Sequence, residues 1–418
     1  MQSEIIKQIE EANKKALEAL NSCEPHLVAV APARDVIPGM KDNMLLHAGP
    51  PVEWDRMCGP MKGAVIGALI FEGMASNEEE ALRLIKNGDI TFEPCHHHQA
   101  VGPMAGIISP SMQCFVVEDK NTKRRAFCNL HEGRGKILRF GAYDKEVIDR
   151  LKWMNDVLGP AINDALKLGS INLKTLMAEA LHMGDECHQR FKASTSLFAN
   201  RLVVPMLNSG LDKRTAKEVL DFIITREQTF LNLSMPAMKL TADSAHGIKY
   251  STVVTTMARN GVEFGIKVSG LGEKWFTAPA LVPDGLFFPG YGPQDASLDL
   301  GDSAIMETCG FGAFAMAAAP AVLSFVGGKA SEAIEYTKKM YLITVGESPS
   351  YTIPILGFRG LPTGIDILKV LKMNLQPMIN TGIAHKQAGI GQIGAGIAKV
   401  PIECFEKALK EYDEKYLK

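Results

Sequence analysis

The sequence predicts an α/β fold of the α+β type, with two mixed α/β domains and a small helical domain between them. Residues 1–150 and 246–418 mix helix-like and strand-like hydrophobic patterns, whereas residues 151–245 carry apolar residues mainly at three- and four-residue spacings. A chain of 418 residues is also longer than one hydrophobic core usually supports. We therefore expect domain boundaries near residues 150 and 245.

The N-terminal domain is expected to open with an amphipathic helix in MQSEIIKQIEEANKKALEAL, followed by a strand in HLVAVAPAR. Two helices are predicted in GAVIGALIFEG and NEEEALRLIKNG, and Asn77 and Gly88 are suited to begin and end the second. A β-hairpin is predicted in CFVVEDKNTKRRAFCNL. We interpret its basic turn, residues 123–125, as solvent-exposed.

The middle domain is predicted to contain helices in DKEVIDRLKWMNDVLG, LKTLMAEALHMGDECHQRF and DKRTAKEVLDFIITR. In the last domain, strands are expected in STVVTTMARNGVEFGIKVSG and DGLFFPG, and a final amphipathic helix in IECFEKALKEYDEKYLK. The uncharged segment TCGFGAFAMAAAPAVLSFVGG has the length of a membrane span. Its many Ala and Gly residues and Pro320 favour a buried helix of a soluble core instead.

Composition excludes several classes of function. A formal net charge of -2 argues against a nucleic-acid partner, and no segment favours a membrane partner. The eight cysteines are scattered without a C-x-x-C pair, which indicates reduced thiols, and the charged N-terminus does not resemble a secretory leader. We therefore expect a cytoplasmic protein.

The segment PCHHHQAVGP, residues 94–103, is the most unusual stretch of the chain. If it is extended, His96 and His98 share one face while Cys95 and His97 share the other, so one metal ion would reach only two of the four side chains. We therefore favour a polar cluster that serves an anionic substrate, in which one imidazole acts as general base, acid or donor. The pattern leaves open which pair faces the pocket, and whether the other histidines only brace loops.

Two loops combine glycines with cationic residues. In LLHAGPPVEWDRMCGPMKGA, Lys62 lies at a helix start whose backbone N–H groups favour an anion, with His47 nearby; an ordinary capped helix is the alternative. In NLHEGRGKILRFG, Arg134 and Lys136 alternate with glycines and predict a concave nest for a phosphate or carboxylate.

Further polar clusters are less specific. On the helix expected in LHMGDECHQR, His182 and Glu186 would lie one turn apart, as a metal pair or, as we prefer, as a hydrogen-bonded helix surface. The C-terminal half contributes polar residues amid small apolar ones: Arg259, Asn260, Glu263, Lys267, Glu273, Lys274, Asp302, Glu307, Asn380 and His385. Residues 389–394 match G-x-G-x-x-G, but no βαβ unit follows, so no dinucleotide and no other cofactor is expected.

Six long motifs stand out along the chain: LLHAGPPVEWDRMCGPMKGA, PCHHHQAVGPMAGIISPSM, LHMGDECHQR, MARNGVEFGI, GYGPQDASLDLGDSAI and INTGIAHKQAGIGQIGAG. Together they resemble one bacterial family, named after AllG, a subunit of oxamate carbamoyltransferase in allantoin breakdown. The resemblance implies two unusual α/β domains, a small helical domain and FdrA-like partner subunits. The S-T-R-T and H-P-x-Q motifs of aspartate and ornithine carbamoyltransferases are absent, and Ser194-Thr195-Ser196 lacks the arginine.

Three hypotheses follow for the function. The first is a carbamoyltransferase subunit that forms a homo-oligomer and binds carbamoyl phosphate and an oxamate- or oxalurate-like carboxylate-amide. The second is a metal-dependent hydrolase or lyase that uses His96, His98, His182, Glu186 or His188. The third is a non-catalytic assembly subunit. We prefer the first, without a bound metal. Its candidate catalytic residues are His96, His97, His98, His385 and Glu263. Its candidate substrate-binding residues are His47, Lys62, Arg134, Lys136, Arg259, Asn260, Asp302 and Asn380.

Overall fold

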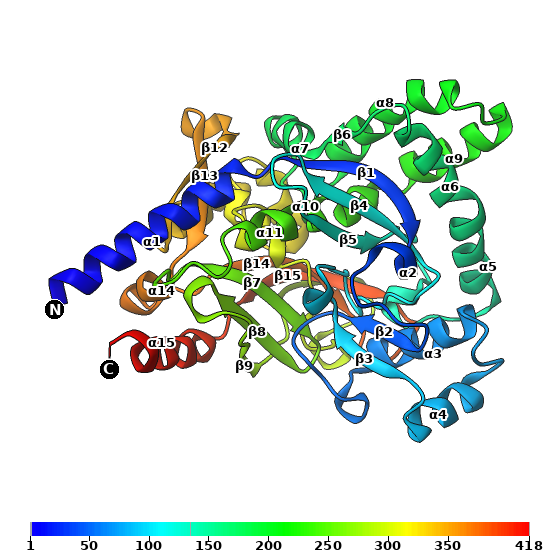
Figure 1. Cartoon of the computed structure of the whole chain (residues 1–418), viewed down its shortest axis with the longest axis horizontal. Helices are drawn as coiled ribbons and strands as arrows, with labels where there is room; N and C mark the ends of the chain where they lie inside the picture. The colour runs from blue at the N-terminus through cyan, green and yellow to red at the C-terminus, as the bar shows by residue number, and fades with distance from the viewer. Residues whose placement is uncertain (1, 134, 418) are drawn as a thin grey trace.

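The α/β fold class is confirmed by the computed structural model, which describes residues 2–133 and 135–417 (Figure 1). The α-helices are α1 (Gln2–Ser22), α2 (Ala33–Val36), α3 (Gly59–Phe71), α4 (Glu78–Asn87), α5 (Lys145–Trp153), α6 (Gly159–Leu166), α7 (Leu173–His182), α8 (Lys192–Asn208), α9 (Lys213–Thr225), α10 (Leu231–Ser244), α11 (Ile305–Thr308), α12 (Leu323–Val326), α13 (Ala333–Tyr341), α14 (Ile367–Met373) and α15 (Ile402–Tyr416). The strands are β1 (Pro25–Pro32), β2 (Met44–His47), β3 (Thr91–Pro94), β4 (Gln113–Asp119), β5 (Arg125–Asn129), β6 (Ile171–Asn172), β7 (Val254–Asn260), β8 (Glu263–Val268), β9 (Phe276–Pro279), β10 (Asp284–Phe287), β11 (Leu300–Gly301), β12 (Thr344–Ile353), β13 (Arg359–Ile365), β14 (Met378–Ala384) and β15 (Gln392–Lys399).

The strands form several small sheets. An antiparallel sheet has the order β5-β4-β1-β6, a second has β11-β7-β8-β9 and a third has β10-β15-β14. The predicted hairpin is β4–β5, and the rejected dinucleotide motif lies at the turn and strand of the antiparallel β14–β15 pair, as expected for a segment without a βαβ unit. Strands β2 and β3 pair in parallel, so their carboxyl ends lie side by side.

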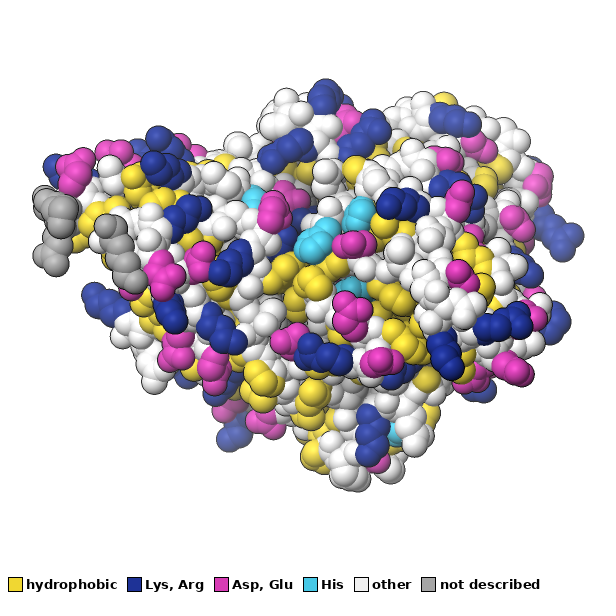
Figure 2. All heavy atoms as spheres, turned by 60° about the horizontal axis from the view of Figure 1, so that its bottom comes forward, with side chains coloured by type: hydrophobic (Ala, Val, Ile, Leu, Met, Phe, Trp, Pro, Cys, Tyr) yellow, Lys and Arg dark blue, Asp and Glu magenta, His cyan; other side chains and the backbone are white. Residues whose placement is uncertain are grey.

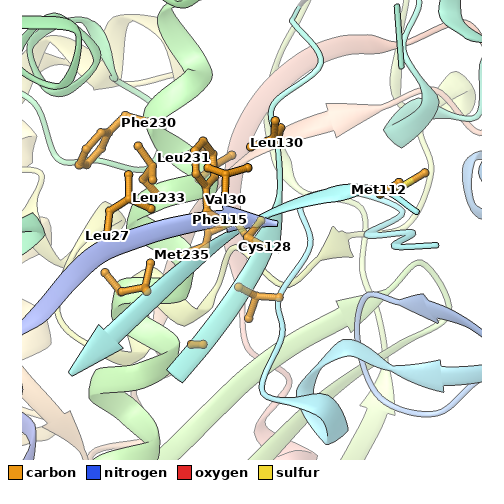
Figure 3. Packing of buried hydrophobic residues seen from close by; sticks show 14 of the residues in the cluster. Leu27, Val30, Met112, Phe115, Cys128, Leu130, Phe230, Leu231, Leu233 and Met235 are labelled. Atoms are coloured by element: carbon orange, nitrogen blue, oxygen red, sulfur yellow. The ribbon is translucent and has the colours of Figure 1, made fainter. Parts of the chain in front are cut away.

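A hydrophobic core lies between the first sheet and α10. Figure 3 shows residues of this core from both sides: Leu27, Val30, Phe115, Phe230, Leu231, Leu233 and Met235. Helix α10 is buried from Leu231 to Ala242, which fits its central position in the molecule. This packing fixes the one lysine of α10 relative to the sheet.

Local signals in the sequence fix several element ends. The Asn77 side chain accepts a hydrogen bond from the Glu80 N–H at 3.0 Å and caps α4. Gly88 ends the same helix with a φ of 78°, which a residue without Cβ adopts at little cost. Both assignments confirm the sequence-based expectation.

The three expected domains share secondary structure. Strand β6, from the middle region, pairs with β1 of the N-terminal sheet. Helix α1 lies beside β12 and β13 of the C-terminal region, and both ends of the chain lie on the same side of the molecule (Figure 1). The division at residues 150 and 245 stays a prediction.

The helix expected in the Gly/Ala-rich segment after Glu307 is wrong. Residues 308–317 are buried, as expected, but the following residues are partly exposed, and the segment is broken into short turns and the single-turn helix α12. Gly310 and Gly312 have φ of 94° and 58°, outside the right-handed helical region, and Pro320 begins a new turn. Within residues 2–133 and 135–417, no helix is long and apolar enough to cross a membrane.

Candidate functional site

The candidate site is a cavity of about 380 Å³ between α10, the β4–β5 turn, β7, β8 and the histidine segment. It is lined by His96, His97, Gln99, Arg124, Arg125, Lys239, Leu240, Asp243, His246, Thr256, Lys267 and Glu273. Four of these side chains are lysine or arginine, two are carboxylates and three are imidazoles. We call this cavity the histidine pocket. Its size and its excess of cations suit a small anion.

The histidine segment is a 3₁₀ turn, Cys95–His98, and not the extended chain for which we considered the two faces. A 3₁₀ turn advances three residues per turn, so neighbouring side chains point about 120° apart and the two-face alternation does not apply. As a result, His96 and His97 line the pocket, while the Nδ1 atom of His98 bonds to the Pro38 carbonyl oxygen at 2.7 Å. The buried Cys95 donates its thiol to the Gly106 carbonyl at 3.3 Å.

The His96 side chain is fully buried beside Asp302. Its Nε2 atom lies 3.5 Å from the Asp302 Oδ1, and neither ring nitrogen has a hydrogen-bond partner among the described residues. Burial lowers the pKa of His96 below its usual range, although the nearby Asp302 carboxylate acts in the opposite direction. The imidazole is therefore neutral near pH 7 and able to accept a proton.

Asp302 positions this imidazole by joining two Gly-Pro loops. Its Oδ1 accepts from the Gly49 N–H at 2.7 Å and its Oδ2 from the Gly102 N–H at 2.9 Å. Gly49 follows β2, and Gly102 follows the histidine turn after β3, so both loops leave the same edge of the parallel pair. A ligand site at the carboxyl ends of parallel strands is a recurrent arrangement.

Two buried lysines supply charge inside the pocket. The Nζ atom of Lys239, on α10, bonds to Asp243 one turn further on at 2.6 Å. The Nζ atom of Lys267, on β8, bonds to Glu273 at 2.6 Å and lies 5.0 Å from the Trp275 ring centre. Burial lowers the pKa of Lys267, and the Glu273 carboxylate opposes that shift.

The Trp275 ring connects the lysine with the histidines. Its Nε1 donates to the His97 Nε2 at 3.0 Å, and its edge faces the His96 ring with centroids 5.8 Å apart. Because the His97 Nε2 accepts this bond, the proton of neutral His97 lies on Nδ1, 3.5 Å from a Glu93 carboxylate oxygen. Burial also lowers the pKa of His97.

The basic hairpin turn contributes to the pocket, which we did not predict. Arg124 donates to the Asp243 carbonyl at 3.1 Å, and Arg125 pairs with Glu118 at 2.9 Å. Both side chains are largely solvent-exposed, as expected for a turn, but they line the rim of the cavity. Figure 2 shows acidic and basic side chains mixed over one face of the molecule, with histidine side chains reaching the surface near its middle.

Arg259 and Asn260, which we predicted to bind substrate, lie outside the histidine pocket and bond to other parts of the fold. All five N–H donors of the fully buried Arg259 are engaged, by Asp299, the Gly301 carbonyl, Ser303 and Thr381. Asn260 donates to the Pro50 carbonyl at 3.0 Å and accepts two backbone N–H bonds that close the β7–β8 turn. The Arg259 side chain therefore has no N–H donor left for a ligand.

A second buried polar cluster surrounds Asn380. Its Nδ2 donates to Glu186 at 3.1 Å and its N–H donates to Glu307 at 3.2 Å, while His188 bonds to the same Glu307 oxygen at 2.7 Å. Burial and the neighbouring Asp185 raise the pKa of Glu186 to about 8. The helix predicted through this motif is wrong, because α7 ends at His182 and Gly184 has a φ of 80°.

The remaining predicted residues do not join the histidine pocket. The buried His47 bonds through Nδ1 to the Ala48 carbonyl oxygen, and the Lys62 ammonium lies over the Trp54 ring. Lys136 pairs with Asp144, and His385 lies in the loop after β14. Glu263 pairs with Arg56 at 3.5 Å, and the Lys386 backbone covers the start of α3, where an anion was expected. Arg134 lies outside the described residues, so its predicted nest stays a prediction.

The residues of the metal hypothesis lie in different places, although Glu186 and His188 both belong to the cluster around Asn380. His182 bonds to Thr352 near the surface, His188 bonds to Glu307, and His96 lies in the pocket. In the described part of the chain, no three His, Cys, Asp or Glu side chains form a group that could hold a metal ion.

Sequence reasoning missed Lys239 and His246 and assigned no role to Lys267 and Glu273. One signal was present: Lys239 and Asp243 are the only charged residues of α10, four positions apart. A lone ion pair in an otherwise uncharged buried helix indicates a polar site on one side of that helix. His246 gave no local signal, because its contacts come from β7 and from the turn before β9.

Known proteins resemble this chain over nearly its whole length. The family described as "Oxamate carbamoyltransferase subunit AllG" matches residues 90–303, which include every residue lining the histidine pocket. The chain is 46% identical to the "Oxamate carbamoyltransferase subunit AllG" of Escherichia coli (strain K12), over 97% of this chain and 98% of that protein. It is 50% identical to the "Uncharacterized protein YahG" of the same strain, over 99% of this chain and 88% of that protein.

A solved structure has the same fold. The crystal structure of a conserved protein of unknown function from Enterococcus faecalis V583 has a TM-score of 0.96 and 48% identity, covering 97% of this chain and 98% of that one. Long motifs, fold and near-complete alignment agree. This chain belongs to the AllG family.

Proposed function

We propose that this protein is a subunit of a carbamoyltransferase assembly and that its histidine pocket binds a small anionic substrate. The observation that carries the proposal is the neutral imidazole of His96, whose ring nitrogens make no hydrogen bond with the described residues, in a pocket with two buried lysines and in a relative of an oxamate carbamoyltransferase subunit. Buried unpaired polar groups are rare and cost free energy, so they mark sites that a ligand completes.

The proposed reaction joins an oxamate-like carboxylate-amide and carbamoyl phosphate. The amide nitrogen attacks the carbamoyl carbon, a C–N bond forms, the C–O bond to phosphate breaks, and inorganic phosphate leaves. The nitrogen loses one proton, which His96 is placed to accept. Lys239, Lys267, Arg124 and Arg125 offset the charge of the two anionic substrates, which would otherwise repel each other.

Two further parts of this proposal come from the resemblance to the family. FdrA-like subunits are proposed as partners, and this chain is proposed to associate with further copies of itself. A role as a non-catalytic assembly subunit is the competing function, and the next experiment separates the two.

The test is phosphate release from carbamoyl phosphate plus oxamate, measured with this chain and FdrA-like partner subunits. We expect release that depends on both substrates and that falls at least a hundredfold in His96→Gln, the range for loss of a general base. Release that is unaffected by His96→Gln, Lys239→Met and Lys267→Met would identify an assembly subunit. No release and no binding of either substrate would reject the proposal.

A further inference from the structure

The Glu273 side chain is 79% exposed, yet its carboxylate contacts two side chains of the histidine pocket. One carboxylate oxygen lies 2.6 Å from the Nζ atom of Lys267, and the other lies 3.1 Å from the Nε2 atom of His246. The Lys267 side chain is only 3% exposed. The pocket thus holds one carboxylate that reaches in from solvent.

The chain around Glu273 does little to fix its side chain. Glu273 follows Gly272, whose φ is 70° and around whose missing side chain there is open space. In the described part of the chain, the only hydrogen bonds and ion pairs of this carboxylate are those with Lys267 and His246. Since an exposed glutamate retains most of its freedom in water, little holds it in place apart from these two contacts.

The other acid of the pocket is fixed differently. Asp243 lies one helical turn from Lys239 on α10 and is 26% exposed, so the rigid helix holds the pair together. Lys267 has no such partner on its own strand. A buried ammonium without an anion is strongly unfavourable, so Lys267 requires either Glu273 or a ligand in the same position.

We propose that the Glu273 carboxylate occupies the place of a substrate carboxylate, and that a small carboxylate ligand displaces it and binds Lys267 and His246. The exchange keeps the charge of Lys267 paired throughout, because one carboxylate replaces another. His246 presents Nε2 to the same point, since its Nδ1 is engaged with the Thr255 hydroxyl at 2.8 Å. Trp275 borders both this subsite and His96, so a ligand anchored on Lys267 extends toward the imidazole.

The identity of the ligand as an oxamate-like carboxylate rests on the proposed function, whereas the displacement itself does not. The subsite assigns the carboxylate end of such a substrate to Lys267 and His246. It leaves Lys239, Arg124 and Arg125 for the second anionic substrate.

The test is calorimetric titration of the full chain with oxamate and, separately, with inorganic phosphate. Glu273→Gln removes the competing charge and keeps the side-chain size, so oxamate should bind about fivefold more tightly than to the wild type. Glu335→Gln is the matched control, because Glu335 also pairs with a lysine, Lys338, at 3.0 Å but on the surface. The affinity of this variant for oxamate should equal that of the wild type. Lys267→Met, checked for folding by circular dichroism, should lose oxamate binding.

Unchanged or weaker oxamate binding by Glu273→Gln would overturn the proposal. A gain for phosphate that exceeds the gain for oxamate would overturn the carboxylate assignment. Because binding is measured without turnover, the outcome is separate from that of the phosphate-release assay. If phosphate release occurs but Glu273→Gln leaves oxamate affinity unchanged, the displacement is wrong and the proposed function stands. If Glu273→Gln binds oxamate more tightly but no phosphate is released, the displacement stands and the proposed reaction is wrong.

Discussion

The Nε2 atom of His96 lies 3.5 Å from the Oδ1 atom of Asp302, and both side chains are fully buried. Asp302 also accepts the N–H groups of Gly49 and Gly102. A carboxylate that holds two loops and faces an imidazole can orient that imidazole and stabilise its protonated form during a reaction. The predictions below separate this role from the structural roles of other buried polar groups.

The first prediction concerns the neighbouring histidines. His96→Gln should lower the rate of phosphate release at least a hundredfold, because the pocket loses its proton acceptor. His98→Gln should leave the rate within about twofold, since His98 does not line the pocket and its Nδ1 atom bonds to the Pro38 carbonyl oxygen. Steady-state kinetics of the assembled enzyme provides the measurement. Equal losses in both variants would contradict the assignment.

Asp302→Asn should destabilise the fold as well as the site. The amide keeps one acceptor for the two glycine N–H groups and directs an NH₂ group at the other, which replaces a charge-assisted hydrogen bond with a clash of donors. We expect a loss of about 2–4 kcal/mol in the free energy of unfolding, measured by urea titration. Asp42→Asn, at an exposed ion pair with Arg34, should show no measurable change. An unchanged Asp302→Asn would show that the loops do not depend on this carboxylate.

Arg259→Lys tests whether Arg259 has the structural role that its hydrogen bonds indicate. A lysine has three donors on a flexible stem and cannot reproduce the planar set of bonds to Asp299, Gly301, Ser303 and Thr381. The loss should be about 3–5 kcal/mol of unfolding free energy, with oxamate affinity unchanged in the fraction that remains folded. Arg56→Lys, at the exposed pair with Glu263, is the control. Weaker oxamate binding with full stability would restore Arg259 as a ligand residue.

The buried Glu186 should make stability depend on pH. Its pKa of about 8 lies above the usual value of 4.5, so the folded state holds a proton that the unfolded state releases. The stabilisation is present below pH 4.5 and is lost as the pH rises toward 8. Glu186→Gln imitates the protonated group and does not titrate. The difference between the Tm of this variant and that of the wild type should therefore increase, in favour of the variant, as the pH rises from 5 to about 8.5. A difference in Tm that is independent of pH would contradict this.

The sequence predicted the local features of the fold better than the features that depend on distant residues. The cap at Asn77, the hairpin β4–β5 and the amphipathic α1 and α15 were predictable, because each depends on residues within one or two turns of the chain. The expected helix after His182 failed, because Gly184 in a left-handed conformation and the burial of Glu186 outweigh helical periodicity.

The histidine pocket shows the same division. The sequence by itself determined that His96 and His97 belong to an unusual polar segment and that the chain resembles one bacterial family. Only the tertiary structure decided that these imidazoles line one pocket with Lys239 and Lys267, and that Arg259 is fully engaged elsewhere. The physical reason is that each of these contacts joins residues more than a hundred positions apart in the chain or on different elements, whereas local patterns carry information only about neighbours.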